Sequence, residues 1–169
     1  RARPGARVLL GGDEDVGDGA RAPDGQTWRQ VFTQEVRASI PDSDWSRVHF
    51  LGRLDRVRFT HLLQVSRVHV YLSYPFVLSW SLLEAMSVGA AIVASDIAPV
   101  REVIDHGEHG HLVDFFDKAQ LVRAIADLLD DPARRAHLGQ QARSRARDRY
   151  DLQGICLPQQ LAWIDQLSS

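Results

Sequence analysis

The chain has 169 residues, of which 44% are hydrophobic and 25% charged, and its net charge at pH 7 is −2. These values are typical of one ordinary globular domain, and they exclude a positive field over the whole chain that would attract nucleic acid or an acidic membrane. One cysteine, Cys156, excludes an internal disulfide, and the sequence shows neither an apolar run that could span a membrane nor a signal peptide, so we expect a cytoplasmic protein.

The chain begins with the pattern of a strand followed by a helix. Residues 6–12 predict a short buried strand that ends in two glycines, and a polar loop follows. A helix is expected after Thr27, because Thr27 and Gln30 have the spacing of a capping box, and it should end before Pro41. A second strand is expected at 47–52.

The remaining elements continue the alternation. From residue 117 the pattern is helical to the end of the chain, with breaks at Pro132 and at 149–154. Before that, the expected elements are a helix at 58–66, a strand at 68–73, a helix at 79–89, a strand at 90–95, a helix at 98–107 and a strand at 110–113.

Strands that alternate with helices predict βαβ crossovers and a parallel sheet. The strands are continuously apolar, which is typical of strands buried on both faces. The predicted architecture is therefore an α/β fold with a Rossmann-like, doubly wound parallel sheet. Ligands of such sheets bind beyond the carboxyl ends of the strands, so the candidate site lies in the loops 11–26, 52–57, 73–80, 95–98 and 104–110.

Glu84 is the main candidate residue, because it is the single carboxylate in the apolar stretch between Tyr74 and Ser95. Ser81 and Glu84 have the spacing of a capping box, which the local pattern favours and which would make Glu84 an ordinary helix-start residue. The same helix end offers N–H groups and a positive dipole that suit a diphosphate, and a carboxylate there has acceptors for a ribose diol. The sequence leaves both interpretations open.

Residues 82–113 resemble the donor-binding half of the retaining glycosyltransferases of family four, the group-one family. Residues 47–73 and 121–152 also resemble that family, so the resemblance covers roughly 7 to 155. The family's pattern of L-E-A-M, a glycine, V-A-S, a glutamate and G-x-x-G-x-L-V is matched by Leu83, Glu84, Ala85, Met86, Gly89, Val93, Ala94, Ser95, Glu102, Gly107, Gly110, Leu112 and Val113.

The resemblance implies that residues 1–169 are the Rossmann-like, C-terminal half of a two-domain GT-B enzyme. Such an enzyme moves a sugar from a nucleotide-sugar donor, which is a substrate, to an acceptor hydroxyl, so no cofactor and no metal are expected. Glu84 would bind the donor ribose, and the N–H groups of residues 78–80 would face the diphosphate. The donor-binding residues that the resemblance implies are Gly52, Arg53, Leu54, Phe76, Leu78, Ser79, Trp80 and Glu84.

The chain departs from the family in two ways. The family pairs two glutamates in an E-x7-E motif, but Phe76 stands at the first position, where the family's glutamate contacts the donor sugar, and Val77 and Ser79 replace two glycines. A catalytic Arg and Lys are expected upstream of Arg1, as is the N-terminal acceptor domain. The chain is therefore expected to be an inactive piece of a longer enzyme, which could associate peripherally with a membrane.

A noncatalytic α/β module that binds a nucleotide or a partner protein is the alternative function, and Phe76 in place of glutamate favours it. An epimerase or phosphorylase with the same two-domain fold is a further alternative.

Other candidate residues have simpler interpretations. His106, His109 and His111 have the spacing of metal ligands, but we expect them in an exposed loop. Residues 13–19 fail the order of a calcium loop. Cys156 is expected to pack, and the arginines between 134 and 149 to form the solvated side of a helix. The family's last helix crosses back to the other domain, so we expect these apolar side chains to be exposed: Leu157, Leu161, Trp163 and Ile164.

Overall fold

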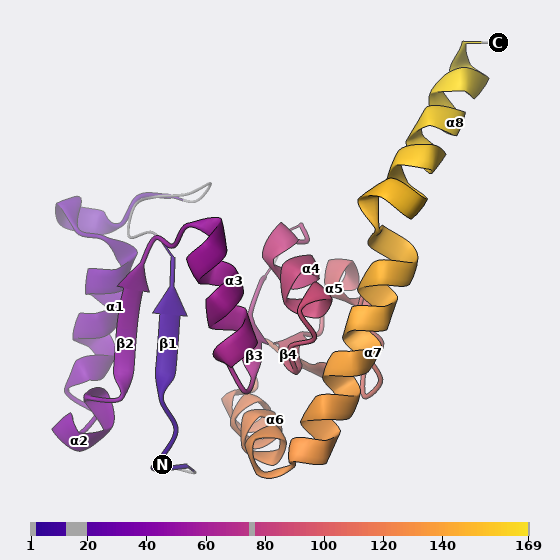
Figure 1. Ribbon diagram of the computed structural model, residues 1–169. Helices are drawn as coiled ribbons and strands as arrows, with labels where there is room; N and C mark the ends of the chain where they lie inside the picture. Colours follow the sequence, from indigo (N-terminus) through magenta and orange to yellow (C-terminus); the bar gives the residue numbers. More distant parts are fainter. Residues whose placement is uncertain (1–2, 13–19, 75–76, 169) are drawn as a thin grey trace. The chain divides into compact units, whose positions relative to one another are not determined.

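The computed structural model describes residues 3–12, 20–74 and 77–168, which fall into two compact units, 1–59 and 60–169 (Figure 1). Residues 13–19, which were compared with a calcium loop, and Phe76 lie outside the described residues.

The first unit is a pair of parallel strands with helices. Val8 of the first strand lies opposite Val48 of the second. The polar segment before the first helix contains a 3-10 turn at Pro23–Gly25. The regular elements are β1 (Val8–Gly11), α1 (Trp28–Arg37), α2 (Asp42–Trp45) and β2 (Val48–Gly52).

The start of α1 confirms the capping box. The Thr27 hydroxyl accepts the Gln30 N–H at 3.2 Å, and the Gln30 side chain accepts the Thr27 N–H at 2.9 Å. These two bonds satisfy donors that a helix start would otherwise leave unpaired.

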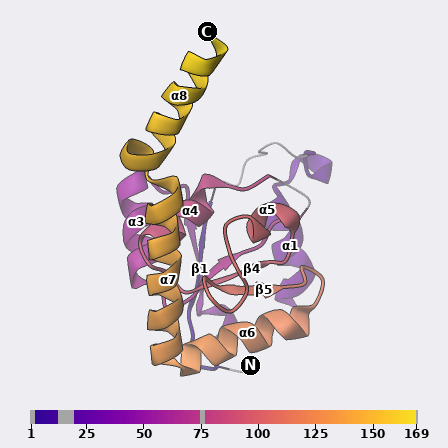
Figure 2. The same cartoon turned by 90° about the vertical axis from the view of Figure 1, so that its right-hand side faces the viewer.

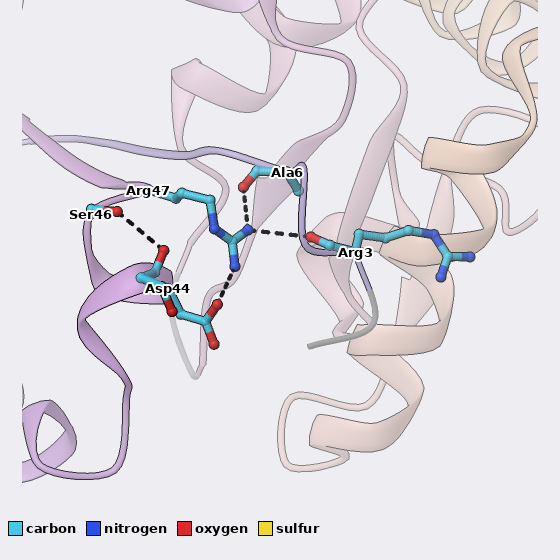
Figure 3. Close-up of polar contacts among 6 residues, drawn as sticks. Arg3, Ala6, Asp44, Ser46 and Arg47 are labelled. Atoms are coloured by element: carbon cyan, nitrogen blue, oxygen red, sulfur yellow. Dashed lines mark hydrogen bonds and ion pairs between the residues drawn. The ribbon is translucent and has the colours of Figure 1, made fainter.

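Arg47 links the segment before β1 with the turn before β2 (Figure 3). Its guanidinium donates to the carbonyl oxygens of Ala6 at 2.7 Å and Arg3 at 3.3 Å, and to the carboxylate of Asp44 at 2.6 Å. Because charged donors form the stronger hydrogen bonds, this half-buried side chain fixes the entry to β1 beside the turn that precedes β2.

The second unit contains a three-stranded parallel sheet in the order β3–β4–β5. The expected breaks at Pro132 and after Tyr150 are confirmed, the latter by a π-helical turn at Leu152–Cys156. The elements from residue 56 on are α3 (Arg56–Val65), β3 (His69–Tyr71), α4 (Trp80–Ser87), β4 (Ile92–Ser95), α5 (Ala98–Arg101), β5 (His111–Val113), α6 (Lys118–Asp130), α7 (Pro132–Tyr150) and α8 (Leu157–Leu167).

The core of the second unit surrounds β4, all of whose residues are buried. Val93 of β4 packs with Val113 of β5 and with Leu128 and Leu138 from the two following helices. Figure 2 shows α6 below the sheet and α7 alongside α4, in agreement with the contacts between these elements.

The parallel α/β architecture is confirmed, but the strands form two sheets and differ in burial. β4 is buried on both faces as expected, whereas the side chains of Val8, Leu9 and Leu10 in β1 are 40–48% exposed. Burial on both faces needs packed elements over both faces of a sheet, and β1 lies with β2 in a two-stranded sheet separate from that of β4.

The last helix, α8, leaves the rest of the second unit and contacts the π-helical turn (Figures 1 and 2). Its side chains Leu157, Leu161, Trp163 and Ile164 are 43–62% exposed. The prediction of an exposed apolar face on the final helix is therefore confirmed.

Two glycines let α4 and α7 approach closely. Gly89 ends the α4 segment with a positive φ of 79°, a conformation that favours glycine. A Cβ added to Gly139 of α7 would lie 2.1 Å from the Gly89 carbonyl oxygen. Gly139 is therefore a contact position that has no room for a side chain.

We expect Gly139→Ala to lower the free energy of unfolding by about 1–3 kcal/mol, because backbone atoms would have to move and overpacking costs that much. The loss should appear even though alanine favours a helix over glycine by about 1 kcal/mol. Urea unfolding of the chain measures the change.

Gly5→Ala is the matched control, since a Cβ there meets nothing within 4 Å. If Gly139→Ala were as stable as the control, the close approach of α4 and α7 would be wrong.

Candidate functional site

The start of α4 is fixed by Ser79, which follows β3 and its loop. Ser79 has extended backbone angles, and its hydroxyl oxygen accepts the Ser81 N–H at 3.3 Å. The helix therefore begins at Trp80, at the carboxyl end of β3, as the sequence predicts.

This start shows that the capping-box interpretation of Glu84 is wrong. With Ser79 as the N-cap, Glu84 is the fifth residue of the helix, whereas a capping box needs a glutamate at the third. The Ser81 hydroxyl bonds that of Ser79 instead. Among the residues that the structure describes, the half-buried Glu84 carboxylate has no hydrogen-bond partner. It retains its full capacity to accept hydrogen bonds.

The N–H groups assigned to a diphosphate are not equivalent. The Ser79 N–H donates to the Tyr71 hydroxyl at 2.9 Å. The N–H groups of Leu78 and Trp80 have no acceptor among the described residues. Two of the three expected donors are thus available at the helix end, where the dipole favours an anion.

Buried side chains hold the loop before α4 at both ends. Tyr71 is the last residue of β3 and is 9% exposed, and its hydroxyl binds Ser79. The Ser95 hydroxyl, fully buried at the end of β4, accepts the Ser73 N–H at 2.9 Å. The sequence predicts no role for Tyr71. The signal that could have found it is a tyrosine at the end of a predicted strand, just before a loop at the carboxyl edge of the sheet.

The loop after β4 carries an ion pair. Arg101 Nε donates to Asp96 Oδ1 at 2.6 Å. This hydrogen bond, with the charge of Arg101, holds the pKa of Asp96 below its ordinary value and raises that of Arg101. Because the two charges compensate each other, the pair adds little net field for an anion at this edge of the sheet.

The remaining candidate residues of the loop after β2 lie in the first unit. Gly52 has a φ of 65°, and its carbonyl oxygen accepts the Gly12 N–H at 3.0 Å. Arg53 is exposed and Leu54 half-buried. The structure thus brings Leu78, Ser79, Trp80 and Glu84 together on one helix start in the second unit, and Gly52, Arg53 and Leu54 on one turn in the first.

The first unit also holds an apolar cavity of about 460 Å³ between α1 and the two strands. Phe32, Val36 and Trp45 line it, and Arg29 stacks over the ring of Phe50 at 4.1 Å. Gly12 and Gly52 belong to the lining, so the cavity reaches the carboxyl ends of β1 and β2. That is the edge at which α/β sheets bind ligands.

The three candidate metal-binding histidines do not converge on one point. His106 Nδ1 accepts the Leu112 N–H at 3.0 Å, and His109 Nδ1 accepts the Asp105 N–H at 3.2 Å. His111 Nε2 accepts from Arg134 at 3.2 Å, and burial with the charge of Arg134 lowers the pKa of His111. These bonds hold the loop together, and His109 is buried, so the prediction of an exposed loop is wrong for it.

Asp105, Glu108 and His109 are the three groups that do lie close, with ligand atoms within 4.8 Å of one another. The guanidinium of Arg145 is 3.6 Å from the Asp105 carboxylate. A cation at this point would therefore compete with a positive side chain.

Within the described residues, no helix is both long and apolar enough to cross a membrane.

The sequence pattern of the family described as "Glycosyl transferases group 1" matches residues 45–145. N-acetyl-alpha-D-glucosaminyl L-malate synthase of Bacillus anthracis is 29% identical over 121 residues, which are 72% of this chain and 31% of that protein. The chain thus spans about a third of that relative's length.

Two solved structures share the fold. Sucrose-phosphate synthase from Thermosynechococcus elongatus has a TM-score of 0.80 and 26% identity, over 96% of this chain and 39% of its own. Alr3699/HepE of Anabaena, solved with UDP-glucose, has a TM-score of 0.77 and 24% identity, over 98% of this chain and 42% of its own. The chain therefore belongs to the group-1 glycosyltransferase family and has the Rossmann-like α/β fold of the GT-B enzymes.

Proposed function

We propose that this chain is the donor-binding part of a retaining glycosyltransferase that moves a sugar from a nucleotide-sugar to an acceptor hydroxyl. The carboxylate of Glu84 carries this proposal, because it lies half-buried and without a hydrogen-bond partner among the described residues, just inside the start of α4. Family membership supports the reaction class, and the place of α4 after β3 supports the ligand class.

The donor diphosphate binds at the N-terminus of α4. The N–H groups of Leu78 and Trp80 donate to its oxygens, and the helix dipole adds to the attraction. The Ser79 N–H stays with Tyr71, so that bond orients the helix start and takes no part in holding the anion.

Glu84 binds the ribose hydroxyls. It lies four residues after Trp80, which is about 6 Å along the helix axis. A nucleotide that has its diphosphate at the helix end can therefore reach the carboxylate with its sugar, and each carboxylate oxygen accepts one hydroxyl of a diol.

Catalysis in this proposal rests on stabilising the leaving diphosphate. As the bond to the sugar breaks, negative charge grows on the phosphate oxygens, which face N–H groups that are already oriented. The basic pair expected upstream of Arg1 would add to this charge stabilisation, and no metal is required. The side chain of Phe76 has no hydrogen-bond acceptor, so the contact that the family's first glutamate makes with the donor sugar is either lost or supplied by another side chain.

The exposed face of α8 supports a second domain as the partner. Its apolar side chains stay 43–62% exposed although α8 contacts the π-helical turn of its own unit, and such faces commonly mark an interface. The acceptor domain of the intact enzyme is the occupant that we propose.

Phe76 in place of glutamate keeps one rival function open, a module that binds a nucleotide without transferring a sugar. The rival shares donor binding with our proposal and differs in turnover, so the experiments below measure both.

In the full-length enzyme, Glu84→Gln should weaken binding of the donor by about 10- to 150-fold, because a charged hydrogen bond to a hydroxyl contributes about 1.5–3 kcal/mol. A thermal-shift panel of UDP-, GDP- and ADP-sugars first identifies the donor, since a ligand at 100 times its Kd stabilises a protein by about 2.7 kcal/mol. Calorimetric titration then gives the two dissociation constants.

Glu35→Gln on α1 is the matched control, because it makes the same change at an exposed position. Melting curves of both variants should coincide with that of the unmodified enzyme. An unchanged donor Kd in Glu84→Gln would remove the residue from the site.

The 169-residue chain should transfer no sugar at a rate near that of the full-length enzyme, although it should bind the donor. Loss of one oriented electrostatic donor costs about 100- to 1000-fold in rate, and the expected basic pair lies outside this sequence. Radiolabelled sugar transfer by both proteins measures the ratio. Comparable rates would refute the expectation, and a full-length protein that binds the donor without turnover would support the noncatalytic module.

A further inference from the structure

Three aromatic side chains, Tyr74, Phe115 and Phe116, form an exposed cluster in the second unit. The rings of Tyr74 and Phe115 are stacked with centroids 5.5 Å apart. Phe116 stands edge-on to both, at 5.1 Å from each. Phe116 is 69% exposed and Tyr74 is 56% exposed, so the cluster leaves aromatic surface in contact with water.

The cluster lies at the carboxyl edge of the sheet. Tyr74 follows β3, and the two phenylalanines follow β5, while β4 runs between those two strands. The rings therefore meet across the end of β4, at the same edge as the start of α4. Neither the helix-end site nor the core uses them.

Hydrogen bonds hold the loop of the two phenylalanines in place. Asp114 Oδ1 accepts the Phe116 N–H at 2.8 Å, and the Asp114 N–H donates to the Gln120 side chain at 2.7 Å. Asp117 Oδ1 accepts the Gln120 N–H at 2.8 Å and caps α6. The backbone thus presents the rings to solvent in a fixed geometry, which lowers the entropy lost on binding.

We propose that this aromatic cluster is a binding platform for an uncharged saccharide ring, the sugar part of the acceptor. The apolar C–H face of a pyranose packs on an aromatic ring, and its hydroxyls need hydrogen-bond acceptors beside that ring. Asp114 and Asp117 flank the phenylalanines, and the bonds described above occupy one oxygen of each carboxylate. The platform rests on the proposed transfer of sugar to an acceptor.

Charge and size favour a saccharide over larger partners. The carboxylates of Asp114 and Asp117 would repel an anionic membrane surface. A stable protein interface buries about 800 Å² on each partner, whereas three partly exposed rings of 150–250 Å² each offer much less. One sugar ring matches the area available.

Saturation-transfer NMR on the full-length protein tests the platform, with methyl α-D-glucopyranoside and methyl α-D-mannopyranoside as saccharide probes and cyclohexanol as an apolar probe of similar ring size. We expect saturation on the pyranose C–H protons of at least one saccharide. Phe116→Ala should weaken binding of that saccharide by about 2- to 10-fold, since one aromatic contact contributes about that much to affinity. Phe116→Tyr should restore the binding.

Val65→Ala is the matched control, because Val65 is 73% exposed and lies outside the cluster. Melting curves show whether each variant is folded. Titration of the same samples with the donor that the thermal-shift panel identifies reports the helix-end site separately. The platform is overturned if neither saccharide shows saturation transfer, or if Phe116→Ala binds it as tightly as the unmodified protein does. It is also overturned if cyclohexanol binds as well as the sugars, which would indicate a general apolar docking surface. A protein that binds the saccharide but none of the UDP-, GDP- and ADP-sugars would instead count against the donor site.

Discussion

The capping of α4 by Ser79 is the interaction on which the candidate site depends. It sets the first residue of the helix, and with it the register of every side chain that follows. A start two residues later would bring Glu84 to the third helical position and turn its carboxylate into a partner for the backbone. Because the helix starts at Trp80, the Glu84 carboxylate lies too far along the helix to accept the N–H of the N-cap residue. It has no hydrogen-bond partner among the described residues.

Contacts with the rest of the second unit fix the position of that helix start. Tyr71 and Ser95, from the ends of two neighbouring strands, bind backbone N–H groups of the loop before α4. At the other end of the helix, Gly89 and Gly139 allow the backbones of α4 and α7 to touch. Packed cores resist small displacements, so a site built on this helix is positioned by buried strands at one end and by a helix contact at the other.

The sequence contains two copies of the capping-box spacing, and they show what local pattern can and cannot predict. The copy at Thr27 and Gln30 forms both reciprocal bonds, because Thr27 is itself the N-cap residue of α1. The capping box at Ser81 and Glu84 does not form, because Ser79, two residues earlier, is the N-cap and its hydroxyl accepts the Ser81 N–H. The choice between the two serines as N-cap depends on the path of the loop after β3, which is set by tertiary structure.

Other parts of the fold follow the same division. The order of strands and helices, the glycine after α4 and the break at Pro132 are local features, and the sequence predicts them. The burial of His109 is not visible in the sequence pattern, because it depends on the conformation of the loop after α5, in which the Asp105 N–H donates to the His109 ring. The aromatic cluster is not local either, since Tyr74 and Phe115 are 41 residues apart in the chain and meet because β3 and β5 flank β4.

Glu84 and the aromatic cluster share one feature, which is that the fold of the free protein makes little use of either. The half-buried carboxylate accepts no hydrogen bond among the described residues, and the exposed rings contribute little of the free energy that buried aromatic side chains supply. Natural proteins retain such features where function requires them. Both lie at the carboxyl edge of the same sheet, on backbone that hydrogen bonds hold in place. This shared location agrees with our two proposals, in which this edge binds a nucleotide-sugar at the start of α4 and the receiving saccharide on the aromatic cluster.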